Sequence, residues 1–142
     1  CSSFGFINRR IDLANEGDVE AQHDLCFAYI YGNFEVLKNY DKARYWCELA
    51  AKQDNYHSMT LYGEIFFNGY GVERDYQIAY EWFTKAALLG HPHAQYVVAL
   101  MYSKGLYVPV DREKAVYWAD LSSKQDYKYG QELLIKLSNE PE

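Results

Sequence analysis

The chain has 142 residues and a formal net charge of −6, from 14 basic and 20 acidic side chains. This balance argues against sequence-independent binding of nucleic acid, which needs clustered cations to neutralise phosphates. No apolar run approaches the roughly twenty residues that span a bilayer. The length suits one domain with a real core. The fifteen tyrosines exceed what that core needs, and tyrosine can lie half-hydrated at a partner surface.

The first residues are Cys1-Ser2-Ser3. A cysteine followed by small residues is how a mature bacterial lipoprotein begins after its signal peptide is removed. Cys1 is therefore a candidate for lipidation, with residues 1–5 as an N-terminal tail. The alternative is that the chain starts at a domain or cloning boundary. The next segment, 6–17, has loosely helical apolar spacing and is predicted to be a capping helix.

Three segments then share one pattern: 18–54, 55–90 and 91–126. A period near thirty-six residues is typical of a solenoid built from helix pairs. The first helix of each pair has small or apolar residues at i, i+4, i+7 and i+8, and the second has an alanine three residues before a tryptophan. A last helix, 127–138, gives about eight helices. The alanines and tryptophans predicted to be structural are Ala43, Trp46, Ala79, Trp82, Ala115 and Trp118.

Residues typical of helix starts and helix ends support the division into these helix pairs. Gly90 ends the second repeat, where a left-handed backbone needs no Cβ, and Asp54 and Asp126 hold the equivalent position. The tripeptide Lys-Gln-Asp that ends the first repeat returns at the end of the third. Short polar residues precede each second helix and are predicted to be helix caps, not catalytic acids: Asn39, Asp75 and Asp111.

Together these residues resemble the Sel-1-like repeat, a relative of the tetratricopeptide repeat. The second repeat matches best, through Gly63, the turn Gly69-Tyr70-Gly71-Val72, and the alanine and tryptophan of its second helix. The turn of the first repeat, 32–39, is one residue longer and lacks the second glycine. The resemblance implies an all-α fold, an α/α superhelix (solenoid) in one domain. It also implies protein binding, often as an adaptor, and frequent export in bacterial members.

No catalytic, metal or cofactor site is predicted. Some cysteine-rich relatives have been linked to β-lactam binding, but the chain has no Ser-x-x-Lys motif, so a β-lactam-binding or hydrolysing role is disfavoured. His91 and His93 have a spacing that could supply two metal ligands, with His57 one repeat away as a third. Solvent-facing or hydrogen-bonded histidines are the default interpretation of this pattern.

The segment 96–102 is apolar around its whole circumference, which is wider than the stripe that one neighbouring helix requires. Either both sides are buried within the array, or one side is left for a partner. In related solenoids the first helices line the concave face, which favours a protein-binding surface there. The residues mapped to this surface are Phe27, Leu61, Glu64, Phe67, Tyr96, Val97 and Leu100, with Glu20, His57 and His93 at its rim.

Cys26 and Cys47 lie at similar distances on either side of the first repeat's turn, so antiparallel helices would place them at the same height. Cys26 also occupies the small-residue position that Gly63 and Ala99 hold in the other repeats, so its Cβ should face the second helix. A disulfide is therefore one alternative. The other is a pair of buried thiols in a reducing cytosol.

These features predict a non-catalytic, protein-binding solenoid rather than an enzyme. If Cys1 is a lipoprotein start, the chain resembles an exported immunity or inhibitor protein that blocks one cognate effector, such as a type VI secretion lipase. Its location would be the periplasm or the outer membrane, with membrane contact only through the lipid. The alternative is a cytoplasmic adaptor or scaffold in signalling or assembly. No nucleic-acid partner is expected.

Overall fold

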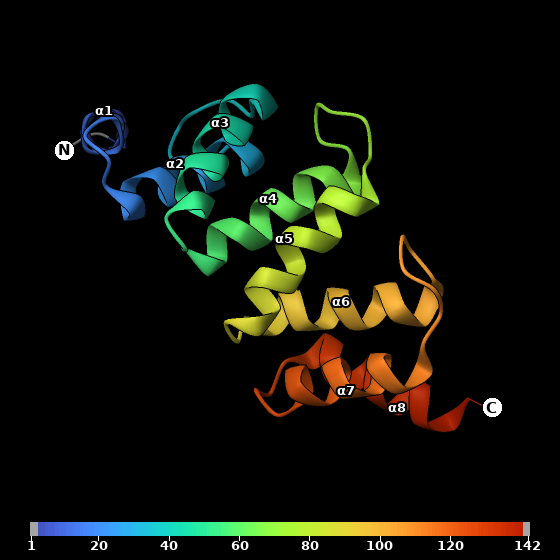
Figure 1. The fold of residues 1–142 in the computed structure, drawn as a ribbon. Helices are drawn as coiled ribbons and strands as arrows, with labels where there is room; N and C mark the ends of the chain where they lie inside the picture. Colours follow the sequence, from blue (N-terminus) through green and yellow to red (C-terminus); the bar gives the residue numbers. More distant parts are fainter. Residues whose placement is uncertain (1–2, 141–142) are drawn as a thin grey trace. The chain divides into compact units, whose positions relative to one another are not determined.

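The computed structural model describes residues 3–140, which form eight α-helices joined by short connections (Figure 1). The prediction of an all-α fold with about eight helices is confirmed. Cys1, and the lipidation predicted there, lies outside the described residues. The helices are α1 (Ser3–Asn15), α2 (Val19–Tyr31), α3 (Tyr40–Lys52), α4 (Tyr56–Asn68), α5 (Tyr76–Leu88), α6 (Pro92–Lys104), α7 (Arg112–Ser123) and α8 (Lys128–Asn139).

The first helix begins earlier than expected. Residues 3–5 were predicted to belong to the tail, yet they form the first turn of α1. The amide hydrogens of a first turn have no intrahelical acceptor in any helix, so weak helix formers such as serine and glycine are tolerated there. Helix α1 therefore begins three residues before the predicted capping helix.

The described chain divides into two compact units at the connection between α4 and α5. Unit 1 contains α1 to α4, and unit 2 contains α5 to α8. In unit 1, α2 packs against α1, α3 and α4. Its core includes Leu25, Ala43 and Ile65, which are fully buried. Cys26 and Cys47 join α2 to α3 inside this core.

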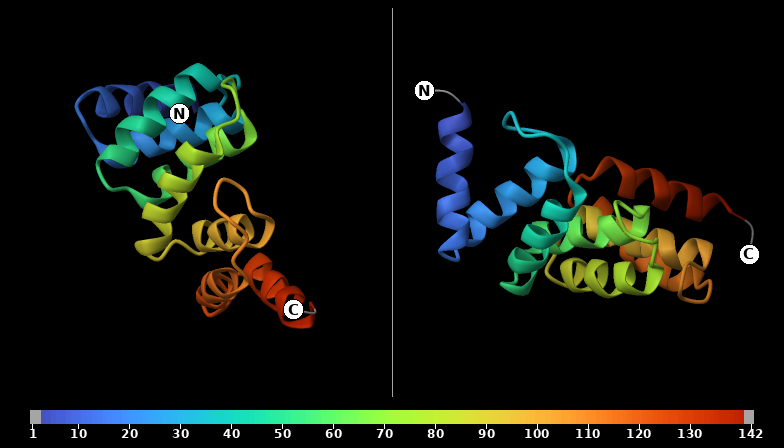
Figure 2. Two further views of the ribbon diagram at one scale, coloured as in Figure 1. Left: turned by 45° about the vertical axis from the view of Figure 1, so that its right-hand side comes forward. Right: turned by 90° about the horizontal axis from the view of Figure 1, so that it is seen from above.

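In unit 2, α6 packs against α5, α7 and α8 (Figure 2). Phe83, Val98 and Met101 are fully buried there, and Leu137 of α8 is nearly so. Burying a large apolar side chain contributes about 1.5 to 3 kcal/mol. These contacts explain why α6 is apolar on nearly every side: it has neighbouring helices on several sides rather than one.

The predicted caps are confirmed. Asn39 accepts a hydrogen bond from the backbone N–H of Lys42 at the start of α3. Asp75 accepts from two backbone N–H groups of the first turn of α5, and Asp111 accepts from that of Lys114 in α7. Each of these side chains thus satisfies backbone N–H groups that have no acceptor within their own helix.

The predicted left-handed positions are also confirmed, with φ of 64° at Asp54, 99° at Gly90 and 58° at Asp126. In the longer turn of the first repeat, which lacks the second glycine, other residues adopt the left-handed backbone. Phe34 and Glu35 both adopt left-handed backbone, with φ of 58° and 62°. The Phe34 ring also contacts the Phe6 ring of α1, with centroids 5.0 Å apart and ring planes tilted by 45°, and this contact helps to hold the unfavourable conformation. Within residues 3–140, no helix has the length and apolar character needed to cross a membrane.

Candidate protein-binding groove

Helices α6 and α8 carry two matching rows of side chains. Along α6 the row is Tyr96, Leu100 and Lys104, and along α8 it is Tyr129, Leu133 and Lys136. Residues three or four positions apart share one face of a helix. Each row therefore runs from tyrosine through leucine to lysine over about 10 to 12 Å, given a rise of about 1.5 Å per residue.

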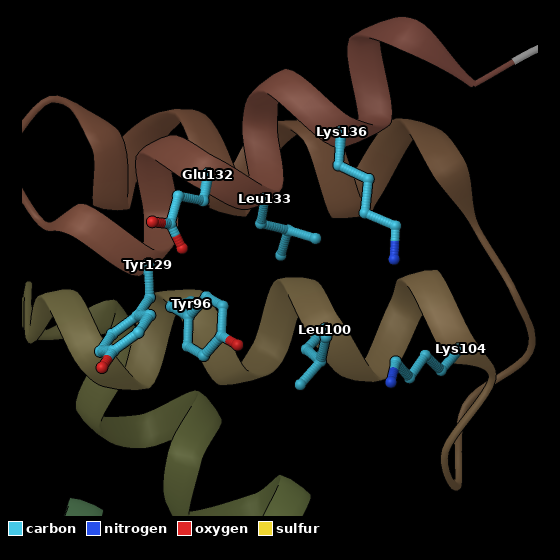
Figure 3. Close-up of a pocket in the computed structure, with 7 residues that line it drawn as sticks. All are labelled: Tyr96, Leu100, Lys104, Tyr129, Glu132, Leu133 and Lys136. Atoms are coloured by element: carbon cyan, nitrogen blue, oxygen red, sulfur yellow. The ribbon is translucent and has the colours of Figure 1, made fainter.

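The two rows enclose a cavity of about 260 Å³ (Figure 3), lined by all six of these residues and by Glu132. Figure 3 shows the tyrosines and Glu132 at one end, the leucines in the middle and the lysines at the other end. We call this cavity the α6–α8 groove. Its two ends differ in charge, because the carboxylate lies at the tyrosine end and both ammonium groups lie at the opposite end.

Aromatic contacts hold the tyrosine end in place. His93 Nδ1 is hydrogen-bonded to the Tyr127 hydroxyl at 2.5 Å, and the Tyr96 ring lies 5.9 Å from the rings of both His93 and Tyr129. Burial raises the pKa of Tyr96, and the nearby Tyr129 and Glu132 raise it further. Tyr96 therefore remains a neutral phenol at physiological pH, with a hydroxyl that can donate a hydrogen bond.

The structure separates the residues that the sequence had grouped on α6. Tyr96 and Leu100 are half-buried and line the groove, so they can contact a partner. Val97 is only 5 % exposed, and its proposed role in binding is corrected to a role in the core. The physical reason is the packing of α6 against both α7 and α8. Both alternatives for segment 96–102 are partly true, because most of its surface is buried and one strip is left open.

Apart from His93, which lies on α6 beside the groove, the other candidate binding residues lie in unit 1, on α2 and α4. Phe27 is 38 % exposed and contacts the Tyr31 ring, with centroids 4.8 Å apart. Glu64 accepts a hydrogen bond from the Tyr31 hydroxyl, and burial together with this carboxylate raises the pKa of Tyr31 to about 12. The remaining residues of this group are Leu61 and Phe67, both half-buried, and Glu20, which is exposed.

The histidines have local roles. His91 caps α6 by accepting from the backbone N–H of Ala94. His57 is exposed and its ring lies 5.7 Å from that of His23. His93 bonds Tyr127, as described above. Between residues 3 and 140, no three His, Cys, Asp or Glu side chains are grouped so that they could hold a metal ion.

The residues assigned to structure are buried to different degrees. Ala43, Ala79 and Ala115 are completely buried, and Gly63 is buried in α4. Trp46 is buried, but Trp82 and Trp118 are half-buried. The Trp82 ring carries the Lys85 ammonium 4.4 Å from its centroid. The shared register of the tryptophans therefore does not give them equal environments.

Cys26 and Cys47 form a disulfide, with their Cα atoms 4.8 Å apart. Of the two alternatives for this pair, the bonded one is correct. Helix α3 turns Cys47 toward α2, where both cysteines are fully buried. A buried disulfide is consistent with an oxidising compartment, because cytosolic thiols are kept reduced in most organisms.

Two hydrogen-bonded glutamine pairs were not predicted from the sequence. Gln53 donates to Gln22 Oε1 at 2.8 Å and to the carbonyl oxygen of Gly17. In unit 2, Gln125 donates in the same way to Gln95 Oε1 at 2.9 Å and to the Gly90 carbonyl oxygen. Each pair links the ends of successive helices. The recurrence of Lys-Gln-Asp in the third repeat indicated that this glutamine has a repeated role. The sequence alone did not show which atoms the glutamine would hydrogen-bond.

Comparison with known proteins bears directly on these repeats. The model of the Sel1 repeat matches residues 19–55, 57–91 and 92–136. The chain belongs to the Sel1-repeat family. The resemblance noted in the sequence is thereby confirmed, and Sel1 repeats generally mediate protein–protein interactions.

Two solved structures of similar sequence have the same fold. A protective antigen of uropathogenic Escherichia coli strains, which displays an SLR fold, is 35 % identical, with a TM-score of 0.83 over 88 % of this Sel1-repeat chain and 27 % of the antigen. A Sel1 repeat protein from Oxalobacter formigenes is 30 % identical, with a TM-score of 0.79 over 90 % of this chain and 96 % of that protein.

Curated relatives are much longer than this Sel1-repeat chain. An uncharacterized protein of Neisseria meningitidis serogroup B is 30 % identical over 81 % of this chain and 23 % of its own length. An ERAD-associated E3 ubiquitin-protein ligase component of Arabidopsis thaliana is 30 % identical over 77 % of this chain and 18 % of its own length. The chain thus spans less than a quarter of the curated relatives that it matches.

Proposed function

We propose that this Sel1-repeat chain is a non-catalytic module that binds one protein partner through the α6–α8 groove. The observation that carries the proposal is the groove itself. Tyr96, Leu100 and Leu133 line a concave site between two helices, with lysines at one end. Concave, partly apolar surfaces with aromatic side chains are where protein interfaces concentrate their binding energy.

The absence of catalysis is part of the proposal. The side chains of Asn39, Asp75 and Asp111 cap α3, α5 and α7. The histidines at the start of α6 take part in capping and in a hydrogen bond with Tyr127. Glu132 is the one carboxylate of the groove. His93 and Tyr127 are hydrogen-bonded to each other beside the groove, but neither side chain lines the cavity, so binding is the role that we propose.

We further propose that the module works as an inhibitor or immunity protein that blocks a partner effector enzyme, such as a type VI secretion lipase, in the periplasm. The buried disulfide supports an oxidising compartment. It disfavours the alternative of a cytoplasmic adaptor. The two roles differ in what happens to the partner: an inhibitor abolishes the partner's enzymatic activity at a one-to-one ratio, whereas an adaptor leaves that activity unchanged.

The binding role can be tested by site-specific photocrosslinking in the native host. A photoreactive residue replaces Leu100 in the groove, and a control chain carries it at Ile135, which is 62 % exposed on α8 outside the groove. One protein should crosslink from residue 100 and not from residue 135. The partner's activity is then assayed with and without the module.

The purified pair gives the quantitative test. Tyr96→Asp or Leu100→Asp should weaken binding at least tenfold, as expected for a central interface anchor, while the helical circular dichroism stays that of the parent. Ile135→Asp should bind like the parent. If no protein crosslinks from the groove above the control, or if both Asp variants bind with parental affinity, the proposed function is wrong.

A further inference from the structure

We infer that the α6–α8 groove recognises a protein segment in which an apolar side chain lies about one helical turn from a carboxylate. The apolar side chain would lie between Leu100 and Leu133, and the carboxylate would meet Lys104 and Lys136. The inference rests on the proposed protein-binding function and adds the chemistry of the segment that is bound.

The first argument is that neither lysine of the groove has a counter-ion among residues 3–140. Neither Lys104 nor Lys136 forms an ion pair or a hydrogen bond with another residue in the described range. The chain as a whole is acidic, with a net charge of −6. Two unpaired ammonium groups at one end of a cavity are therefore a local exception to the charge of the chain.

The second argument compares one spacing that occurs at four places. An acidic residue four positions before a lysine is a favourable helical ion pair, and Glu48 pairs with Lys52 at 2.7 Å. The same spacing in α7 pairs Asp120 with Lys124 at 2.9 Å. In α5 it joins Glu81 to Lys85, which form no ion pair in the described range because the Lys85 ammonium lies over the Trp82 ring instead. In α8 the same spacing joins Glu132 to Lys136, yet these two do not pair. Figure 3 shows that Lys136 instead extends toward the end of the groove where Lys104 lies.

The third argument is the size and lining of the groove. About 260 Å³ is below the usual volume of small-molecule pockets, about 300 to 1,000 Å³, but it admits side chains from a partner segment. The leucines in the middle favour an apolar side chain. A free phosphate would reach the lysines and leave the leucines and tyrosines without contacts, so a carboxylate carried on an apolar segment fits the groove better.

Glu132 sets the direction of the bound segment. It lies at the tyrosine end, opposite the lysines, and it repels a carboxylate placed there. An acidic segment therefore fits with its carboxylate toward the C-terminal ends of α6 and α8. At the tyrosine end, the ring faces of Tyr96 and Tyr129 together with Glu132 favour a neutral or cationic side chain.

The test uses the intact chain and a displayed library of random twelve-residue peptides, selected on the parent and counter-selected on Lys104→Glu/Lys136→Glu. Enriched peptides should share an apolar residue three or four positions from Asp or Glu. Changing that acidic residue to its amide should weaken binding about tenfold, with a larger effect at low salt. Lys128→Glu adds the same charge to α8 outside the groove, and it should leave affinity unchanged.

Charge exchange makes the test specific. A peptide with lysine in place of its carboxylate should bind the parent weakly and regain about tenfold affinity for Lys104→Glu. The inference is overturned if the enriched peptides need no carboxylate, if they ignore both groove lysines, or if nothing is enriched. It is also overturned if inorganic phosphate or anionic vesicles, and not peptides, bind the lysines. If a natural partner crosslinks at residue 100 but its binding requires no carboxylate, the proposed function stands and only this inference is wrong.

Discussion

Gly130 of α8 lies so close to Ser122 of α7 that a Cβ at residue 130 would overlap Ser122 Oγ and lie 2.7 Å from Ser122 Cβ. Ser122 is fully buried, and its hydroxyl donates to the Pro92 carbonyl oxygen at 2.9 Å. The equivalent pairs in the earlier repeats are Ala50 with Ser58 and Ala86 with Ala94. The missing side chain at 130 therefore makes room for the hydroxyl at 122.

Gly130→Ala should lower the free energy of unfolding by about 1 to 3 kcal/mol, because α7 and α8 must move apart. Adding Ser122→Ala should recover part of that loss, since the hydroxyl is removed but the backbone of residue 122 stays close. Urea denaturation of the four chains of this cycle measures the coupling. Gly5→Ala is the control, because a Cβ there meets nothing within 4 Å. Equal stability of Gly130→Ala and the parent would contradict the prediction.

Reduction of the disulfide between Cys26 and Cys47 should destabilise the fold by about 3 kcal/mol, since the bond closes a loop with a sequence separation of 21. The measurement is urea denaturation with and without reductant. The double variant Cys26→Ala/Cys47→Ala serves as the control, because its unfolding should be indifferent to reductant. Alkylation of denatured, unreduced protein should label neither Cys26 nor Cys47, and labelling of both would show that the bond is absent.

Because of His23, we expect the free energy of unfolding to decrease on mild acidification. Burial lowers its pKa below the usual 6.5, and His57 lowers it further, outweighing Asp24 and Glu20, which raise it. Asp24 also pairs with Arg10 at 3.3 Å. Below pH 6.5 the unfolded chain binds a proton at this position more readily than the folded chain does, so stability is complete above 6.5 and declines as the pH falls toward the folded pKa.

Two measurements check this effect. Titration of the His23 ring by NMR should give a midpoint below 6.5, and unfolding should become easier between pH 7.5 and pH 5. In His23→Gln the decline with pH should be shallower. A midpoint at or above 6.5 would refute the assignment, and an unchanged decline in the variant would place its origin at other groups.

Trp46→Ala should cost about 3 to 5 kcal/mol, because the indole is buried in unit 1. Trp82→Ala and Trp118→Ala should each cost less, since both rings are half-buried. Thermal denaturation of the three variants gives the ranking. If the Trp46→Ala chain melts at the same temperature as its parent, Trp46 does not contribute to stability and the prediction is wrong.

Periodicity was sufficient to predict the helices, because a repeated pattern tests each assignment several times. The caps at Asn39 and Asp111 and the left-handed aspartates followed from local backbone chemistry, which depends on neighbouring residues alone. The disulfide could be narrowed to two alternatives but not decided, since the facing of Cys47 depends on how α3 rotates against α2.

The groove was only partly predictable. Tyr96 and Leu100 were assigned correctly to an open face of α6, but Val97 was not, because exposure depends on which neighbours α6 acquires. The partner row on α8 was not anticipated, since no binding residue was predicted in the last helix, 127–138. The two rows share a groove only once α6 and α8 lie together, and this arrangement is a tertiary property.

The disulfide has a mechanical consequence as well. If the chain is pulled from its two ends, the segment between Cys26 and Cys47 contributes no length, because the load passes through the sulfur bridge. About 70 Å of contour, roughly 3.4 Å for each residue in the loop, stays hidden until the bond is reduced. Force-extension curves of the oxidised chain should therefore end short of those of the reduced chain by that amount.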